Sequence, residues 1–238
     1  MTVKILVFAG SARTDSLNKK LARVAAEAVR AAGAAATFID LADYPMPLYD
    51  GDLESREGVP ANARKLKDLF IAHQGLFIVS PENNASVSAL LKNTLDWISR
   101  EDGNESGLVP YQGKVAAIAG ASPGALGGLR GLTHLRAILQ TLNVLVLSEQ
   151  FALGRAHEAF NGDGSLKDAK QQFAIGALAK RLVEVSAKLG ALAPFHRRSL
   201  RRSSQYNTVS GGSAPGLPRS CSLEGLPCIC SNRSQFFC

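Results

Sequence analysis

Cysteine is missing from the first 193 residues of this 238-residue chain, because all four cysteines lie after that point. Aromatic residues make up only 6% of the chain, with a single tryptophan. No apolar run approaches the roughly 18 residues that a membrane-spanning helix needs. The sequence therefore excludes disulfides and cysteine-bound metals in its first 193 residues, and it predicts no membrane span.

The last part of the chain, residues 194–238, differs sharply in composition from the rest. It is rich in Ser, Arg, Pro and Gly, shows no helical or strand periodicity, and contains the cysteines. Their spacing does not match a zinc site, so no metal is predicted there. These cysteines are Cys221, Cys228, Cys230 and Cys238. We expect one folded domain over residues 1–193 and a disordered or non-native tail over residues 194–238.

Positive charge is concentrated in the same tail. The chain carries a net charge of +7, but six of its 27 Lys and Arg and only one of its 20 Asp and Glu lie in residues 194–238, so the tail is +5 and the rest only +2. A nearly neutral domain gives no reason to expect a nucleic-acid partner. The chain begins directly with an apolar strand pattern and not with a signal peptide, so we expect a cytoplasmic protein.

Two common phosphate motifs are also missing at the place where a phosphate site is expected. Residues 3–9 form an apolar run typical of a buried parallel strand, and a polar turn then leads to a helix starting near Leu17. Neither GxGxxG nor GxxxxGK[ST] fits residues 10–18, which disfavours dinucleotides and nucleoside triphosphates. The free N–H groups of the helix start favour a terminal monophosphate, with Arg13 adding charge. The alternative is that Ser11 and Ser16 only cap the helix and Arg13 is solvated.

Apolar strands and amphipathic helices alternate along the first 190 residues. A parallel sheet of five strands with helices on both faces follows from this alternation, which makes the fold class α/β. A long loop with two prolines is expected between the second strand and the next helix. The predicted strands cover residues 3–9, 36–41, 75–80, 114–121 and 144–148; the predicted helices cover 17–32, 60–73, 88–100, 129–142 and 167–189; the long loop covers 43–58.

Three of the predicted loops are polar and follow the first, third and fourth strands. They are residues 10–18, 81–87 and 122–128. In the doubly wound strand order 2-1-3-4-5, these strands are neighbours, and ligands bind at the carboxyl ends of such strands. We therefore expect the three loops to converge on one binding site.

These loops and the helices after them carry a family resemblance. GSARTDSLN, PENN followed by ALLKNTLDW, and SPGALGGLRGLTHLR occur in this order. Together they resemble the flavodoxin-like NAD(P)H-dependent FMN reductases, which include bacterial quinone, chromate and azo-dye reductases. The resemblance covers about residues 1–190.

The resemblance implies where FMN would bind. The positions that match phosphate contacts are Ser11, Arg13, Ser16, Leu17 and Asn18. Those that match the flavin-ring loop are Pro81, Glu82, Asn83 and Asn84, and Ser122 matches the opposite wall. The family usually has PEYN where this chain has PENN, so Asn83 stands in the place of a tyrosine, which changes the shape of the ring site.

The resemblance also implies the reaction. Hydride would pass from NAD(P)H to FMN and then, by ping-pong kinetics, to a small-molecule acceptor such as a quinone, chromate, an azo dye or ferric iron. The chemistry belongs to the cofactor, so no catalytic acid, base or metal is predicted. Homodimers or homotetramers are expected, with the loop 43–58 and the helix containing Trp97 as candidate contacts.

Two other functions compete with this one. A flavodoxin-like one-electron carrier would not oxidise NAD(P)H directly, but such carriers are usually acidic and this domain is not. A nucleotide-binding dehydrogenase could use Asp40 for a ribose hydroxyl, but it lacks GxGxxG.

Several polar residues outside the loops are given structural interpretations. We expect Lys92, Asn93 and Asp96 to fix their helix to neighbouring elements, and Trp97 to lie in the core or at a subunit contact. The histidines His73, His134 and His157 have no Ser or Cys partner at a recognisable spacing, so no catalytic triad is predicted.

Overall fold

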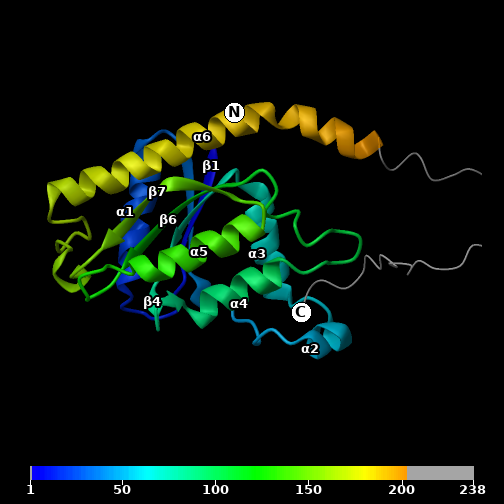
Figure 1. The fold of residues 1–238 in the computed structure, drawn as a ribbon, viewed down its shortest axis with the longest axis horizontal. Coiled ribbons are helices and arrows are strands. Elements are labelled where there is room, and N and C mark those ends of the chain that lie inside the picture. Colours follow the sequence, from blue (N-terminus) through cyan, green and yellow to red (C-terminus); the bar gives the residue numbers. More distant parts are fainter. Residues whose placement is uncertain (1, 203–238) are drawn as a thin grey trace, which may run out of the picture. The chain divides into compact units, whose positions relative to one another are not determined.

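A computed structural model describes residues 2–202, and its centre is a five-stranded parallel sheet (Figure 1). The strand order is β2-β1-β3-β6-β7. Since β4 and β5 form a separate two-stranded hairpin, this is the predicted order 2-1-3-4-5, and the predicted fold class is confirmed. The sheet strands are β1 (Lys4–Ala9), β2 (Ala35–Ile39), β3 (Gly75–Val79), β6 (Val115–Ala121) and β7 (Leu145–Leu153).

Helices cover both faces of this sheet. On one face α1 and α6 pack against side chains such as Val7 and Val79, and on the other α3, α4 and α5 pack against side chains such as Phe8 and Ile78. Alternate residues of each strand thus enter two separate cores, because successive side chains point to opposite faces. The helices are α1 (Leu17–Ala31), α2 (Gly51–Glu57), α3 (Ala61–Ala72), α4 (Ala89–Ile98), α5 (Leu129–Thr141) and α6 (Ala169–Arg202).

Helix α1 begins and ends where the sequence predicts. Ser16 caps its start, with Oγ accepting the N–H of Lys19 at 3.3 Å. After its end, Gly33 has φ +84°, a left-handed conformation that glycine adopts without strain. The helix start therefore lies directly after β1, at the carboxyl end of the sheet.

The structure corrects two boundaries in the first half of the chain. The second strand was predicted to continue to residue 41, but β2 ends at Ile39 because Asp40 caps a short 3-10 helix, Leu41–Asp43, by accepting the N–H of Ala42. The predicted loop 43–58 contains α2, whose start is capped by Asp50.

Three more predicted elements differ from the structure after residue 80. The fifth strand was predicted to end at residue 148, yet β7 continues to Leu153 through polar residues and a register shift opposite β6. Residues 81–87 were predicted as a loop, but they contain the hairpin of β4 (Glu82–Asn83) and β5 (Ser86–Val87). The last helix was predicted to end at residue 189, while α6 continues to Arg202.

Within the described residues, no helix is both long enough and apolar enough to cross a membrane. The predicted tail lies, from residue 203 on, outside the residues that the structure describes.

Candidate functional site

Three loops are joined at the carboxyl edge of the sheet, where β1, β3 and β6 end side by side (Figure 1). The N–H of Gly10, which follows β1, donates to Val79 O at 2.9 Å. Gly10 O in turn accepts the hydroxyl of Ser88 at 2.6 Å, and the N–H of Ser80 donates to Ala119 O at 2.8 Å. The loops at residues 10–16, 81–88 and 122–128 therefore start from one interconnected edge, as predicted.

The first loop presents hydrogen-bond donors around the start of α1. Ser16 is buried by its capping role, while Ser11 is half-buried and Arg13 is exposed. The guanidinium of Arg13 forms no ion pair or hydrogen bond with residues 2 to 191, the range in which side chains are described. The first turn of α1, which starts at Leu17, contains no acidic residue to neutralise the positive helix end. This loop can therefore offer backbone N–H groups and one free cation to an anion.

Asn18 has a different place from the other residues of the first loop. Its side chain is buried and pairs with the backbone of Ala121, at the end of β6. Nδ2 donates to Ala121 O, and the N–H of Ala121 donates to Oδ1, both at 2.9 Å. Asn18 was predicted to contact the phosphate with its backbone and its side chain. Because the side chain is bonded to Ala121, we now expect only the backbone N–H to do so.

The second loop is a tight β-hairpin. Asn84 and Ala85 have φ values of +49° and +64°, so both central residues are left-handed, as in a type I′ turn. Asparagine tolerates this conformation, but alanine does so only at a steric cost of roughly 1–2 kcal/mol. Asn83, which pairs with Ser86 across the hairpin, is exposed. The residue in place of the family tyrosine thus stands on the surface next to a strained turn.

Glu82 anchors the hairpin to α5. Its carboxylate accepts the backbone N–H groups of Arg130 and Gly131 at 3.0 and 3.2 Å, and the Nε of Arg130 at 2.8 Å. Desolvation by itself would raise the pKa of Glu82. The hydrogen bonds outweigh it and hold this pKa below the ordinary carboxyl value. His134 adds a second link, with Nδ1 2.9 Å from the Ser86 hydroxyl. The Glu82 carboxylate is thus occupied in positioning the loop.

The third loop packs tightly against the end of β7. Ser122 N–H donates to Leu153 O at 3.1 Å, and its hydroxyl accepts the N–H of Gly124 at 3.2 Å. Gly127 has φ +61°, and a Cβ there would lie 2.7 Å from backbone atoms of residues 152–154. Because no larger residue fits, the predicted wall of the site is made of closely packed backbone.

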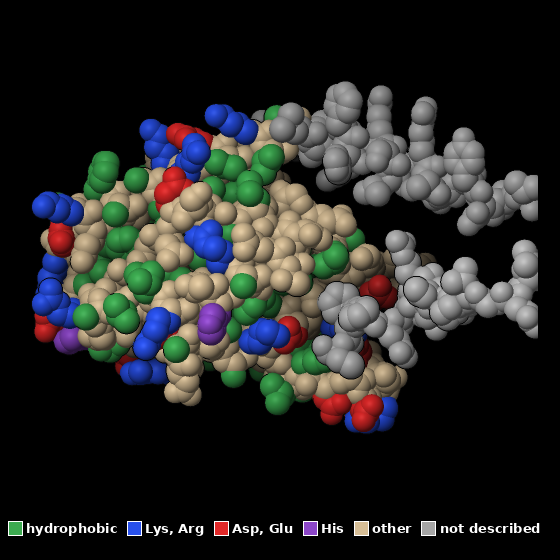
Figure 2. All heavy atoms as spheres, in the orientation of Figure 1, with side chains coloured by type: hydrophobic (Ala, Val, Ile, Leu, Met, Phe, Trp, Pro, Cys, Tyr) green, Lys and Arg blue, Asp and Glu red, His purple; other side chains and the backbone are tan. Residues whose placement is uncertain are grey.

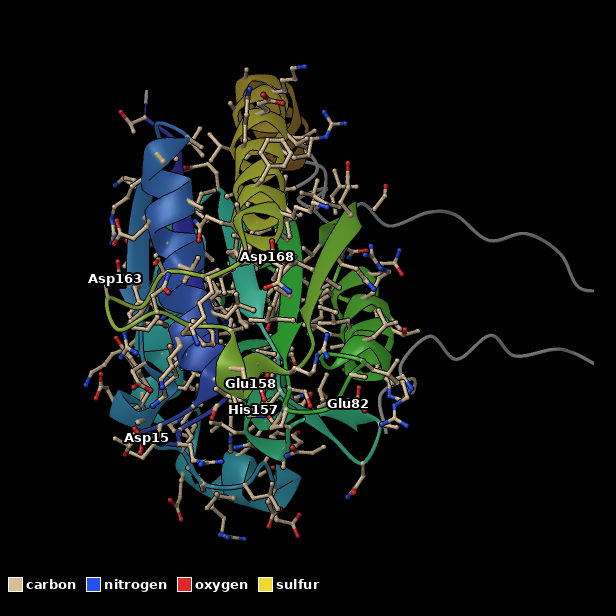
Figure 3. All side chains as sticks on the ribbon, turned by 90° about the vertical axis from the view of Figure 1, so that its left-hand side faces the viewer. Asp15, Glu82, His157, Glu158, Asp163 and Asp168 are labelled. Atoms are coloured by element: carbon tan, nitrogen blue, oxygen red, sulfur yellow. The ribbon has the colours of Figure 1, made fainter. Side chains whose placement is uncertain are left out.

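The segment after β7 also reaches this edge, which the sequence did not predict. Arg155 is exposed, has φ +47°, and donates its N–H to Gly124 O at 3.2 Å. His157 and Glu158 follow, with His157 Nε2 3.1 Å from the Glu158 carboxylate. Figure 3 shows His157 and Glu158 at the same end of the sheet as Glu82 and Asp15. Because the predicted strand ended at residue 148, these residues were assigned no position at the site.

In helix α4, which follows the hairpin, Asn93 and Trp97 have the structural roles that were predicted for them. Asn93 Oδ1 accepts the N–H of Tyr49 at 2.7 Å, and its Nδ2 donates to Pro47 O at 2.9 Å. Trp97 is fully buried and donates its indole N–H to Pro47 O at 2.8 Å, so it belongs to the core and not to a subunit contact. Lys92 instead pairs with Asp96 within the helix.

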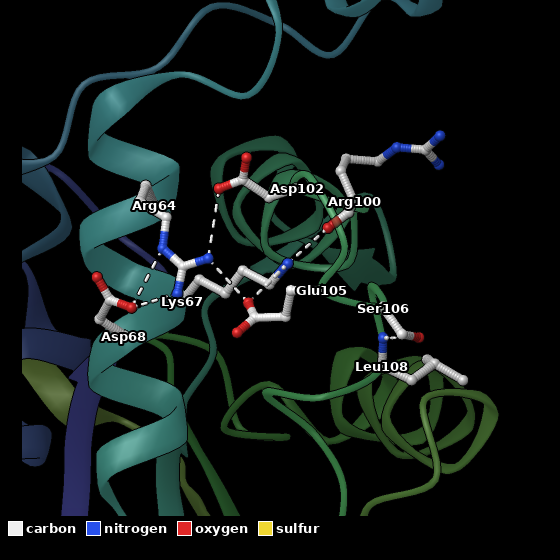
Figure 4. Close-up of polar contacts among 8 residues, drawn as sticks. All are labelled: Arg64, Lys67, Asp68, Arg100, Asp102, Glu105, Ser106 and Leu108. Atoms are coloured by element: carbon white, nitrogen blue, oxygen red, sulfur yellow. Dashed lines mark hydrogen bonds and ion pairs between the residues drawn. The ribbon is translucent and has the colours of Figure 1, made fainter. Parts of the chain in front are cut away.

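A cluster of charged residues joins α3 to the segment that follows α4 (Figure 4). Arg64 of α3 contacts Asp68, Asp102 and Glu105, and the buried Lys67 lies 3.2 Å from Glu105. These pairs hold the segment between α4 and β6 against α3. The carboxylates of the cluster are paired with Arg64 and Lys67, so we assign it a structural role.

Both carboxylate oxygens of Asp40 make contacts within the protein. Its Oδ1 accepts the N–H of Ala42 at 3.0 Å, and its Oδ2 is 2.6 Å from the ammonium of the buried Lys19. A ribose hydroxyl would therefore meet a carboxylate that already holds a backbone N–H and the Lys19 ammonium. This occupancy counts against the dehydrogenase alternative.

Neither a metal cluster nor an enclosed cavity defines the site. Among residues 2–202, no group of three or more His, Cys, Asp or Glu could hold a metal ion, and the tail cysteines lie outside this range. Two depressions of about 610 and 600 Å³ occur beside α1 and beside α6, and neither includes a residue of the three loops. The site therefore rests on loop geometry: free donors at one end and flat, close backbone beside them.

Comparison with known proteins agrees with this geometry. Residues 3–158 match the family described as NADPH-dependent FMN reductase. The chain is 37% identical over 149 residues to a 2-hydroxy-1,4-benzoquinone reductase from a Burkholderia species, covering 63% of this chain and 76% of that protein. It is 34% identical over 170 residues to an NAD(P)H-dependent FMN reductase from Pseudomonas aeruginosa, covering 71% and 86%.

A solved structure gives the same result for the fold. The chain is similar to the flavoenzyme NAD(P)H:(acceptor) oxidoreductase FerB of Paracoccus denitrificans, with a TM-score of 0.67 and 29% identity over 79% of this chain and 98% of that one. The prediction of an oxidoreductase that works with FMN and NAD(P)H is thus confirmed at the level of the family. The chain belongs to the NADPH-dependent FMN reductase family.

Proposed function

We propose that this protein is an FMN-dependent NAD(P)H:acceptor oxidoreductase whose acceptors are quinones. The observation that carries this proposal is the joining of the three loops at one edge, with the Arg13 guanidinium left without a partner among the described residues. Two relatives that are 37% and 34% identical to this chain are named for quinone or FMN reduction, which supports the same reaction here. Chromate, azo dyes and ferric iron are further acceptor candidates that rest on the resemblance alone.

The residues present fit the cofactor. The backbone N–H groups of Leu17 and Asn18, the hydroxyl of Ser11 and the Arg13 guanidinium would hold the phosphate, because they surround a positive helix end without a first-turn acid. Ser16 would contribute through its cap, which fixes that helix start.

A flat ring needs close backbone on either side, and two loops supply it. The hairpin that includes Pro81, Asn83 and Asn84 would lie along the ring, and the loop that starts at Ser122 would form the opposite wall. Glu82 would act through its hold on α5 and not by touching the ring. When bound, FMN would accept a hydride from NAD(P)H and deliver two electrons to the acceptor.

The protein's own part is positioning, and we assign no side chain a proton-transfer role. The exposed Asn83 and the small residues near it leave room for a planar molecule beside the hairpin. If NAD(P)H and the quinone use this one position in turn, the kinetics are ping-pong.

The decisive experiment loads the purified full chain with FMN and measures NADH and NADPH oxidation with a quinone as acceptor. Parallel double-reciprocal lines at several quinone concentrations, and bleaching of the flavin absorption by either nucleotide before quinone is added, are expected. If neither nucleotide bleaches a fully loaded protein, the reductase proposal fails and a one-electron carrier takes its place.

The domain bounds, cellular location and oligomeric state are proposed from the sequence predictions. We propose that residues 1–193 are the reductase domain and that residues 194–238 are a dispensable extension. Further proposals are a cytoplasmic enzyme and a homodimer or homotetramer. Leu48 of the predicted contact loop is 77% exposed, which supports that loop as one subunit contact.

A further inference from the structure

Helix α6 carries an exposed aromatic side chain beside a surface groove. Phe173 is 77% exposed, although soluble proteins usually bury such a ring. The groove, of about 600 Å³, lies between α6 and β7, and Figure 2 shows hydrophobic and charged side chains mixed over this part of the surface. Its lining comprises Glu149, Phe173, Gly176, Ala177, Lys180, Arg181 and Glu184. A protruding ring and a receptive groove thus occur on the same helix face.

The charges on this face are arranged symmetrically about Ala177. Lys170 and Glu184 each lie seven residues from it, about 10 Å along the helix, and Phe173 and Arg181 each lie four residues from it. At 100° per residue, all five side chains fall within about 80° of one another, so they share one face. All five are exposed.

The charged residues of this face have no ion-pair partner in the described chain. None of Lys170, Arg181 and Glu184 forms a salt bridge with another residue in the range 2–191, where side chains are described. A surface with a free cation and a free anion at equal distances from a central alanine is complementary to itself when one copy is turned end for end.

We propose that this face of α6 binds a second copy of the chain through an antiparallel, two-fold contact centred on Ala177. In that arrangement Lys170 of one copy faces Glu184 of the other, twice over. Phe173 of each copy lies against Arg181 of the other, beside Ala177, where the guanidinium can lie near the ring. The contact buries two aromatic side chains and pairs four charges that are free in one chain.

A charge-reversal series tests the contact in the full-length, FMN-loaded protein. Lys170→Glu and Glu184→Lys each place like charges opposite one another, so each should halve the molar mass measured by light scattering after size-exclusion chromatography. The double variant Lys170→Glu with Glu184→Lys should restore the wild-type mass. Lys188→Glu is the control, because its symmetric position, residue 166, lies before α6 begins.

Crosslinking gives a second, positional readout. Helices packed about 8–10 Å apart bring facing Cα atoms at the two-fold axis within disulfide range. With Cys221, Cys228, Cys230 and Cys238 changed to serine, Ala177→Cys should form a disulfide-linked dimer under mild oxidation, while Lys188→Cys should not.

Several outcomes overturn the proposal: a wild-type monomer across micromolar concentrations, single reversals that leave the mass unchanged, or a double variant that stays dissociated. Normal FMN content and NAD(P)H turnover in the variants would show that they are folded. This readout is independent of the reductase proposal, since assembly can fail while turnover persists and turnover can fail while assembly persists.

Discussion

The side chain of Asn18 and the backbone of Ala121 form a reciprocal pair of 2.9 Å hydrogen bonds that joins the start of α1 to the end of β6. The two residues are 103 positions apart, and the pair is buried. It fixes the predicted phosphate loop relative to the predicted wall of the ring site. Precise placement of these two loops is what a bound cofactor would need, because its phosphate and ring must be held at once.

Replacing Asn18 should therefore affect stability and cofactor binding together. Asn18→Ala leaves a buried N–H and C=O of Ala121 unpaired, which should lower the free energy of unfolding by about 1–3 kcal/mol. FMN affinity should fall as well. Denaturant unfolding and FMN titration measure the two effects. Asn62→Ala, which removes two exposed side-chain bonds, to Pro45 O and from Lys65 Nζ, should change the free energy of unfolding by less than about 0.5 kcal/mol.

Arg13 should matter for FMN but not for folding. Its guanidinium is exposed and has no partner among the described residues, so Arg13→Ala should leave the melting temperature unchanged. Loss of a charge-assisted bond worth about 1.5–3 kcal/mol should weaken FMN binding roughly tenfold to hundredfold. Adding Ser16→Ala should weaken binding further and also remove the helix cap. Arg23→Ala, an exposed arginine further along α1, is the matched control, and equal FMN affinity in both variants would contradict the assignment.

Replacing the strained turn residue Ala85 with glycine should keep or increase stability, in contrast to the replacement of Asn18. Ala85→Gly relieves a left-handed alanine at φ +64°, and it should leave the protein equally stable or up to about 1 kcal/mol more stable. Ala31→Gly, at the end of α1, should instead destabilise by about 0.5–1 kcal/mol. Denaturant unfolding of both variants measures the difference, and a clear loss of stability in Ala85→Gly would show that the turn is not strained.

His73 should make stability depend on pH near neutrality. Burial lowers its pKa, and its ring contacts Leu69 O at 2.6 Å and the Thr37 hydroxyl at 2.8 Å. Between the lowered pKa and the unfolded value near 6.5, the unfolded chain binds more protons, so stability falls as pH drops through this window. The depressed carboxyl pKa values of Glu82 and Glu105 act only at more acidic pH.

Melting temperatures between pH 7.5 and 5.5 test this origin of the pH dependence. His73→Gln should show a flatter profile than the wild type, whereas His157→Gln, which changes an exposed ring, should keep the wild-type profile. A steep profile that persists in His73→Gln would assign the effect to another group.

The sequence predicted the sheet order and the convergence of three loops because apolar runs and polar turns are local signals. It did not predict that β7 continues through residues 149–153, since the polar Glu149 and Gln150 on an edge strand resemble a loop until the neighbouring strand is known. Arg155 was missed for that reason. The role of Asn18 also depends on Ala121, which no local pattern could place beside it.

The extent of the functional chain can be tested by truncation. Ending the chain after Ala193 should leave the melting temperature within about 2 °C, and FMN content and quinone turnover unchanged, because every core side chain that the structure describes lies before that point, the last being Leu189. Ending it after Lys180 removes Leu182, which is fully buried, and Ser186, which is 1% exposed, so that protein should be strongly destabilised. Calorimetry and flavin absorbance compare the two truncations. A large loss of stability or FMN in the longer of them would show that residues after 193 take part in folding or binding.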